Sequence, residues 1–438
     1  MRRERPSHVL VRHADFRRLF IGNSVSLLGS SVTTVALPLS AVVYLHASAF
    51  QMGLLGVAAL TPHLLLGLPA GVWVDRLPYR RILVGADIAQ ALLIGTVPVL
   101  ALLHVLDLWQ LYLVVTLAGV ASLFESVTAQ SFTPRLVPVE QLASANSALM
   151  AGNATVNTTG SAVGSALVTL FAAPFALAVD AASFAVAGVL KARISTPGPA
   201  RRTVGRRRLG AEIAAGLRAV FTRPTLRVLM FAAALGALAG QMQSVVLVLY
   251  LVRGLKLSTG LTGLAVTVVG VSGVLSAVAA TAVTRRIGPG PAFIAGMAVS
   301  ALAGLVLVLA AGPQPVVLAV VALAQVLRGA GPSLYGVNQQ TLRQTLVQPE
   351  LLSRVNATWR FLVYGLQPVG ALLGGLLGSL DLRLTLVVGS GVMLVGVAVA
   401  ALSPLRSLHR TPAPVTGRRA WTGGSAGPAD PHSGRPAA

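Results

Sequence analysis

Long runs of apolar residues alternate with short polar segments along nearly the whole chain of 438 residues. A helix needs about 20 apolar residues to cross the ~30 Å hydrocarbon core of a bilayer. Because a lone crossing segment must satisfy its own backbone hydrogen bonds in lipid, each run is predicted to be an α-helix. We place twelve spans, near residues 20–45, 52–74, 82–105, 109–133, 146–170, 174–194, 226–251, 259–283, 291–312, 316–342, 357–379 and 382–403.

The predicted fold class is therefore an all-α membrane protein in which twelve transmembrane helices form two bundles of six. A polar N-terminus (1–19) precedes the first bundle (20–194). A basic, proline-containing linker (195–225) leads to the second bundle (226–403). The remaining tail (404–438) is rich in Pro, Gly, Ser and Arg, a composition that predicts disorder.

The chain carries 34 Lys and Arg residues against 12 Asp and Glu, which gives a formal net charge of +22. The basic residues lie between apolar runs without interleaved aromatic residues, so we expect no nucleic-acid partner. If the N-terminus is cytoplasmic, 30 of the 34 basic residues fall on cytoplasmic segments, with Lys191 counted in the inside segment 191–227. The positive-inside rule then predicts a multi-pass protein of the cell membrane with both termini in the cytoplasm.

Two segments at a constant offset repeat one sequence pattern. Residues 136–146 read LVPVEQLASAN and residues 346–356 read LVQPELLSRVN, an offset of 210 residues. The same offset relates the first span to the seventh. We therefore expect two six-helix halves in the same orientation, and such parallel repeats place a substrate site near the bilayer midplane between the halves.

A polar interruption, GVWVDRLPYRRIL at residues 71–83, lies between the second and third spans. Its spacing resembles the G-x-x-x-D-R-x-x-x-R-R signature of the major facilitator superfamily. The segment LVPVEQLASAN resembles the branch of that superfamily that contains macrolide-efflux and enterobactin-exporter-like proteins. The resemblance covers about residues 15–403. It implies the major facilitator fold, in which spans one, four, seven and ten line a central cavity that the rocking halves expose to alternate sides.

The resemblance also implies that this turn is a gate, which latches the halves on the cytoplasmic face when the carrier is open outward. A glycine allows close passage of the chain, an aspartate is stabilised near helix N-termini, and arginines offer forked donors to carboxylates. The alternative is a basic turn that only sets topology. The second half has Arg285 and Arg286 without the aspartate, so we expect an asymmetric latch. The predicted gating turn comprises Gly71, Asp75, Arg76, Arg80 and Arg81.

Three acidic residues lie within predicted spans. A charge at bilayer depth costs about 2.5–3.5 kcal/mol on insertion scales, so each needs a reason. Asp87 is expected to be a partner of the arginines in the gating turn. Glu125 has two open roles, as a partner of one of those arginines or as a cavity-facing proton carrier. Asp180 is expected to make a structural hydrogen bond.

Arg328 lies near the middle of the tenth span, in QVLRGAGPS. It is expected either to hold an anionic group of the substrate or to neutralise an internal carboxylate such as Glu125. It weakly resembles an arginine–glycine pattern that the superfamily often carries in span four, which has none here, so a proton-relay analogy is weakened. His63 follows Pro62 and is expected to satisfy a carbonyl freed by the proline, with titration as the alternative.

Uncharged polar residues in the first and seventh spans mark the expected cavity. Residues 30–33 correspond by the 210-residue offset to residues 240–243. The alternative role for small polar residues in a bundle is helix packing. The residues expected to line the substrate cavity or to take part in coupling are Ser30, Thr33, Glu125, Gln241, Gln243, Arg328 and Tyr335.

The chain has no cysteine, which excludes disulfides, thiol nucleophiles and thiolate metal sites. It has no Walker-type phosphate loop and no His-x-x-x-His spacing. We therefore expect no catalytic residue, no metal and no cofactor. The expected partners are a small-molecule substrate, protons as the coupling ion and the lipid bilayer, with the protein acting as a monomer.

The sequence is thus interpreted as a secondary active transporter that exports hydrophobic or amphipathic small molecules by proton antiport. Such cargo, for example an antibiotic, a siderophore or another secondary metabolite, fits a cavity with few charges. Direction and coupling follow mainly from the resemblance. The first alternative is an importer of a polar nutrient, which would need more aromatic lining than 5% aromatic residues suggest. A membrane sensor without transport, or a membrane-embedded enzyme, is the second alternative.

Overall fold

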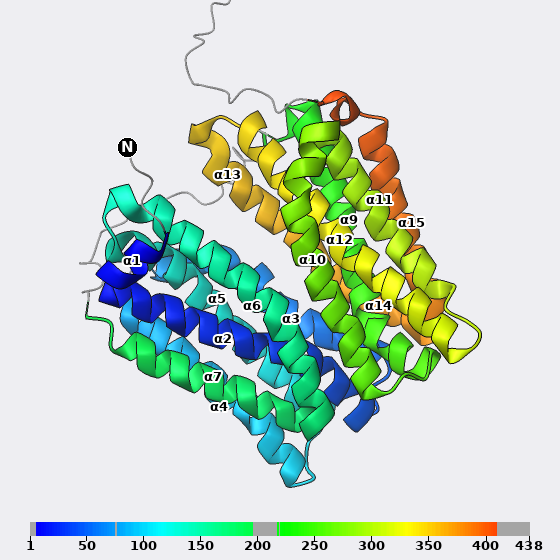
Figure 1. The fold of residues 1–438 in the computed structure, drawn as a ribbon, viewed down its shortest axis with the longest axis horizontal. Helices are drawn as coiled ribbons and strands as arrows, with labels where there is room; N and C mark the ends of the chain where they lie inside the picture. Colours follow the sequence, from blue (N-terminus) through cyan, green and yellow to red (C-terminus); the bar gives the residue numbers. More distant parts are fainter. Residues whose placement is uncertain (1–5, 75–76, 196–216, 219, 410–438) are drawn as a thin grey trace, which may run out of the picture.

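The computed structural model describes residues 6–74, 77–195, 217–218 and 220–409. Within this part of the chain all regular structure is helical, and twelve long helices form two bundles of six, as predicted (Figure 1). Eleven of these helices are long and apolar enough to cross a bilayer. The twelfth, α6 (Leu142–Phe171), has 30 residues and carries more polar side chains along its length.

The first bundle begins with the short helix α1 (Pro6–Arg12). A π-helical turn, η1 (Ser40–Tyr44), extends its first long helix, and a 3₁₀ turn, η2 (Val139–Gln141), precedes the fifth. The long helices are α2 (Ala14–Leu39), α3 (Ala49–Val74), α4 (Tyr79–Leu102), α5 (Leu108–Leu136), α6 (Leu142–Phe171) and α7 (Ala173–Ala192).

The second bundle has the same order of six long helices, with different short elements between them. Its first long helix continues into the π-helical turn η3 (Tyr250–Gly254), and the chain leaves its last helix through the 3₁₀ turn η5 (Pro404–Ser407). The helix α13 (Pro349–Trp359) and the π-helical turn η4 (Arg360–Tyr364) lead into α14. The long helices are α9 (Pro224–Leu249), α10 (Thr259–Ile287), α11 (Pro289–Val308), α12 (Gln314–Leu346), α14 (Gly365–Leu380) and α15 (Leu382–Ala401).

The two bundles repeat each other in backbone detail. The π-helical turns η1 and η3 lie 210 residues apart. Each is followed by a non-glycine residue with positive φ, His46 at 51° and Lys256 at 55°. The amide of Ala47 donates to the carbonyl of Ala41 at 2.8 Å, and the matching bond 210 residues later is 3.0 Å. Because non-glycine residues rarely adopt positive φ, this shared conformation at the predicted offset confirms the repeat.

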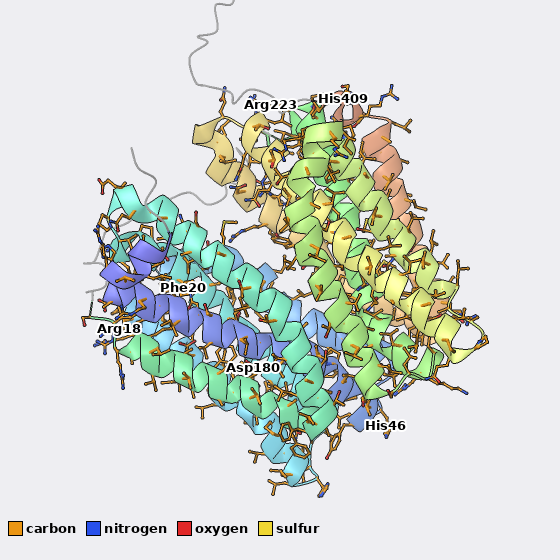
Figure 2. The ribbon with its side chains drawn as sticks, viewed as in Figure 1. Arg18, Phe20, His46, Asp180, Arg223 and His409 are labelled. Atoms are coloured by element: carbon orange, nitrogen blue, oxygen red, sulfur yellow. The ribbon has the colours of Figure 1, made fainter. Side chains whose placement is uncertain are left out.

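The molecule has two distinct ends. The terminus end carries α1, α13 and η5, and Figure 2 labels Arg18 and His409 there. The hairpin end carries η1 and η3, and Figure 2 labels His46 there. The helices of the two bundles approach each other at the hairpin end and diverge toward the terminus end (Figure 1).

Two pairs of helices join the halves, α3 with α14 and α6 with α10. In the first pair, a Cβ added to Gly53 would lie only 2.8 Å from the Cα of Gly375, so the close backbone approach requires glycine. In the second pair, the hydroxyl of Ser165 donates to the carbonyl of Gly263 at 2.6 Å. Both contacts lie in the part of the helices nearer the hairpin end.

A third contact crosses between the halves at the hairpin end itself. Arg253 in η3 donates from Nη2 to the carbonyl of Val42 in η1 at 3.3 Å. Among the described residues, every hydrogen bond between the halves lies toward this end, and no ion pair joins them at the terminus end. The structure therefore represents a state that is sealed at the hairpin end.

Candidate gating turn and transport cavity

The gating turn joins α3 to α4 at the terminus end. Asp75 and Arg76 lie outside the described residues. Gly71 belongs to the last turn of α3, and Arg80 and Arg81 are exposed at the start of α4. Within the described part of the chain, neither Arg80 nor Arg81 forms an ion pair with a residue of the second half.

Aromatic contacts attach both sides of the gating turn to α5. Trp73 stacks on Phe124 with ring centroids 6.0 Å apart and planes at 7°. Tyr79 is buried and meets the ring of Phe132 edge-on at 5.6 Å. The guanidinium of Arg135 lies 5.2 Å from the centroid of the Tyr79 ring. Each aromatic pair contributes about 0.5–1.5 kcal/mol beyond its buried area, so movement of the turn is tied to movement of α5.

A buried ion-pair cluster lies between α4, α5 and α7. The ammonium of Lys191 donates to Oδ1 of Asp87 at 2.9 Å and to Oε1 of Glu125 at 2.6 Å. Gln90 donates from Nε2 to the other carboxylate oxygen of Glu125 at 3.0 Å. The side chains of Lys191 and Asp87 are 0% exposed, and that of Glu125 is 14% exposed. These four residues are called the Lys191 cluster below.

The Lys191 cluster corrects two expectations. Lys191 was counted among the cytoplasmic bases of residues 191–227, but it belongs to the last turn of α7 and its ammonium is buried in the bundle. Asp87 was expected to pair with the arginines of the gating turn, but its ion-pair partner is Lys191, as it is for Glu125. The physical reason is reach, because a buried lysine on a neighbouring helix is closer to both acids than the exposed Arg80 and Arg81.

Two glycines make room for this cluster. A Cβ on Gly22 of α2 would lie 3.3 Å from Cγ and Cε of Lys191. A Cβ on Gly188 of α7 would lie 3.3 Å from Cβ of Asp87. The helices can therefore pack closely enough to exclude water from the lysine stem. Breaking a buried pair by removing one partner costs about 3–5 kcal/mol, so the three charges depend on one another.

Asp180 forms a second buried polar site, in the middle of the first bundle (Figure 2). It accepts a short hydrogen bond from the hydroxyl of Thr33 and a longer one, 3.3 Å, from the hydroxyl of Ser183. Its side chain is fully buried, and its described partners are hydroxyl groups rather than cations. The expectation that Thr33 lines the cavity is corrected, because its hydroxyl joins α2 to α7 inside the bundle.

The second bundle repeats this contact with different chemistry. Gln243 and Ser390, which lie 210 residues after Thr33 and Asp180, hydrogen-bond at 3.1 Å. Gln243 is only 4% exposed, so it fastens α9 to α15 and does not line an open cavity as expected. Gln241 is half-buried at the junction of the halves, with Nε2 3.7 Å from a Cβ built on Gly56 of α3.

Two further predicted residues lie on the first bundle. Ser30 is half-buried on α2, and its carbonyl accepts the hydroxyl of Thr34 at 3.0 Å. His63 is exposed on α3. Within the described residues no hydrogen bond joins the ring of His63 to a carbonyl, so the role expected from the preceding proline is not seen. Neither residue belongs to the buried polar sites described above.

Arg328 lies at the centre of α12 as predicted, without an acid beside it. Its described contact is a long one, 3.5 Å from Nη1 to Oε1 of Gln243. Glu125, a suggested counter-ion, is held by Lys191 instead. Asp381 in the second bundle caps the N-terminus of α15 by accepting from the amide of Leu384 at 2.8 Å. A midplane guanidinium with a neutral amide as its described partner keeps most of its five donors available for an anion.

A pocket of about 510 Å³ lies on the inner face of the second bundle, toward the terminus end. It is bounded by α9, α10, α12, η4 and α14. Tyr335, which the sequence placed in the cavity, does line it, and its ring meets Phe293 edge-on at 6.2 Å. Arg343 also lines it, and its guanidinium lies 4.8 Å from the centroid of the Trp359 ring. The other polar side chains of the pocket include Gln339, Gln340, Tyr364 and Gln367.

The glutamines of this pocket were missed in the sequence. The signal was the polar stretch VNQQTLRQT at residues 337–345, which interrupts the apolar run of α12. In a helix that otherwise faces lipid or protein, four amides and an arginine within nine residues indicate contact with water or a polar ligand. The pocket therefore combines apolar walls with amide, phenol and guanidinium groups.

Comparison with protein families agrees with this architecture. The sequence profile described as Major Facilitator Superfamily matches residues 19–366 and 229–428, which is most of the chain. The chain belongs to the Major Facilitator Superfamily. It is thus a multi-pass membrane transporter by family, and this family is not a class of enzymes.

Relatives of this superfamily member include efflux proteins. The chain is 27% identical over 396 residues to the "Multidrug efflux pump Tap" of Mycolicibacterium fortuitum, covering 87% of this chain and 93% of that protein. It is 28% identical over 130 residues to "Macrolide efflux protein A" of Streptococcus pyogenes, where it spans only 31% of the relative's length and 29% of its own. Its fold matches a mutant of the nucleoside transporter NupG with a TM-score of 0.74 at 12% identity, over 88% of this chain and 98% of that one.

Proposed function

We propose that this superfamily member exports hydrophobic or amphipathic small molecules across the cell membrane by proton antiport. The observation that carries the proposal is the similarity to the multidrug efflux pump Tap along nearly the full length of both chains. Efflux of mixed cargo suits a cavity in which apolar walls are combined with polar groups that orient the ligand. The same resemblance gives no single substrate, so the proposal is limited to this class.

The terminus end is assigned to the cytoplasm in this proposal. The positive-inside distribution supports that orientation, since 29 of the 34 basic residues belong to segments that it places inside once the buried Lys191 is left out. The state sealed at the hairpin end would then be open to the cytoplasm, where a drug is captured. The pocket beside Tyr335 and Arg343 would receive the cargo.

Two polar features take specific roles in this cycle. The gating turn would latch the halves at the terminus end in the outward-open state, with Asp75, Arg76, Arg80 and Arg81 as its charged groups. Arg328 would orient an anionic or electron-rich group of the cargo near the midplane, since its described contact is with a neutral amide. The protein would act as a monomer, with one cavity between its two halves.

Inverted membrane vesicles from a pump-deficient bacterial host test the direction. An exporter accumulates radiolabelled erythromycin, used as a macrolide probe, inside inverted vesicles with an acidic lumen, and a protonophore abolishes the accumulation. Vesicles carrying empty plasmid are the control for passive partition of this apolar drug. Accumulation in right-side-out vesicles alone would overturn export.

Import of a polar solute is the second candidate. The observation that favours it is the lining of the pocket, where glutamines, tyrosines and an arginine suit a solute with many hydrogen-bonding groups. Uptake of radiolabelled uridine into right-side-out vesicles, compared with erythromycin in inverted ones, separates the two. Uridine accumulation without erythromycin accumulation would favour this second candidate over export.

A further inference from the structure

We infer that Glu125 is the proton-binding group of this transporter and that Lys191 is a fixed internal cation that competes with the proton for it. This inference rests on the proposed proton antiport and names the site that would carry it. Proton binding is written as one step, in which the carboxylate of Glu125 takes up a proton and its charge-assisted bond to Lys191 is lost. Lys191 remains paired with Asp87.

The charge balance of the Lys191 cluster is the first support. Two carboxylates face one ammonium, with both acceptor oxygens within 3 Å of the same nitrogen. The cluster therefore carries one excess negative charge when all three groups are ionised. The second oxygen of Asp87, Oδ2, is buried without a hydrogen-bond partner in the described part of the chain. A buried excess charge with an orphaned acceptor is costly, and one proton removes that charge.

Exposure distinguishes which carboxylate exchanges the proton. The side chain of Asp87 is 0% exposed, whereas that of Glu125 is 14% exposed. Glu125 lies on α5, the fourth long helix, while Asp87 lies behind it on α4. Gln90 donates from its side-chain nitrogen to Oε2 of Glu125. Because the amide of Gln90 also has an acceptor oxygen, it can hydrogen-bond the carboxyl group after protonation has broken the bond to Lys191. Glu125 is thus accessible and supported in both protonation states.

The surroundings of Glu125 contain few competing charges. From α4 it faces Asp87 and Gln90, and from α7 it faces Lys191. The nearest other acid on α7 is Asp180, three turns further along, which is occupied by hydroxyl groups. On α2, Arg18 lies one turn before Gly22 and donates to the carbonyl of Arg193, two residues after Lys191. The charge of Glu125 therefore depends chiefly on Lys191 and Asp87, with Asp180 as a further like charge in the same bundle.

The Lys191 cluster exists in the first bundle alone. The repeat offset places apolar or neutral residues at the corresponding positions of the second bundle. Proton binding is thereby assigned to one half, and Arg328 is a midspan charge of the other half whose described partner is a neutral amide. The residues that correspond to Asp87, Glu125 and Lys191 are Met297, Tyr335 and Ala401.

The residue next to Glu125 in sequence contacts the end of α3, just before the gating turn. This residue, Phe124, carries the stacked ring of Trp73, two residues before Asp75. While Glu125 is ionised, Lys191 fixes α5 to α7 through a charge-assisted hydrogen bond. Protonation releases that bond and frees α5, together with Trp73, to shift against α7. Proton binding and movement of the gate would then share one mechanical element.

Infrared difference spectroscopy of the purified full-length protein tests protonation without any substrate. Acidification of the wild type should produce the C=O stretch of a newly protonated carboxylic acid. Glu125→Gln should remove one component of this band, and the matched variant Asp180→Asn, at the other buried acid of the same bundle, should keep that component. Glu125→Gln leaves the Lys191–Asp87 pair intact, so it is expected to fold. A band that is unchanged in Glu125→Gln would overturn the inference.

Proteoliposomes with erythromycin as the probe test coupling. Glu125→Gln should lose uptake driven by a pH gradient while keeping exchange of labelled for unlabelled erythromycin, which needs no net proton movement. Gradient-driven uptake at the wild-type rate in Glu125→Gln overturns the inference and leaves the proposed antiport standing. If the wild type exchanges erythromycin but a pH gradient does not drive its uptake, the proposal of proton antiport itself is wrong. Loss of both activities in a Glu125→Gln protein with wild-type thermal stability would assign Glu125 to cargo handling and overturn the inference.

Discussion

Replacing the buried ammonium tests the energetic role of the Lys191 cluster most directly. Lys191→Met keeps a side chain of similar length and removes its charge. The lysine is 0% exposed and fits against Gly22, so methionine can occupy most of the same space and little packing is lost. The variant therefore isolates the electrostatic effect of leaving Asp87 and Glu125 buried without their cation.

The expected loss is large for one substitution. Removing one partner of a buried ion pair costs about 3–5 kcal/mol, and here two carboxylates lose the same partner. Lowering the pH should reduce the deficit, because protonation removes the uncompensated negative charges. Neutralising the acids as well, in Lys191→Met/Asp87→Asn/Glu125→Gln, should recover most of the lost stability, since a neutral buried set avoids the desolvation of ions.

Thermal unfolding in detergent micelles, followed by tryptophan fluorescence, measures these differences. The order of melting temperatures should be wild type, then the triple variant close to it, then Lys191→Met well below. Leu190→Met, the neighbouring position on the same helix, is a control for a methionine at this level of α7. The reasoning is refuted if Lys191→Met melts with the wild type at neutral pH, or if the triple variant is no more stable than Lys191→Met.

Three further predictions concern the gate, the midplane charge and the seam between the halves. Asp75→Asn should leave the protein folded and slow erythromycin efflux from cells, and unchanged flux would remove the gating role. Arg328→Ala should abolish transport or change the preference between anionic and neutral cargo, and wild-type kinetics with every cargo would leave it a structural charge. Gly53→Ala places a Cβ 2.8 Å from facing backbone and should open the hairpin end. Because the chain has no cysteine, a single cysteine introduced at Gln241 reports this opening by a faster reaction with a maleimide added from outside. The control is Gly391→Ala, whose Cβ meets no atom within 4 Å and which should leave the maleimide reaction rate unchanged.

Local sequence patterns were sufficient for the architecture. Each of the twelve predicted spans corresponds to a long helix of the structure, and the 210-residue repeat relates the helices of the two bundles. Even the π-helical turns obey the repeat offset. These features depend on the hydrophobic length of each segment and on backbone hydrogen bonding within it, and both are properties of a short stretch of chain.

The partners of the charged residues could not be obtained in the same way. Asp87 and Lys191 are separated by 104 residues, and Glu125 and Lys191 by 66. In the sequence, Lys191 is one of ten bases between residues 191 and 227, with nothing to mark it as buried. Its distinctive neighbours, Gly22 and Gly188, make sense only once the helices are packed.

The direction in which each polar side chain points could not be predicted from the sequence either. Thr33 and Gln243 were placed correctly on the first helix of each half, but they face α7 and α15 rather than the cavity. Lipid and protein interior are similarly apolar, so the pattern of a membrane helix gives little information about which face meets its neighbours. The chain's composition and periodicity thus determined which segments cross the membrane and in which order. Only the packing of the helices decided which charges are paired, because that depends on contacts between distant segments.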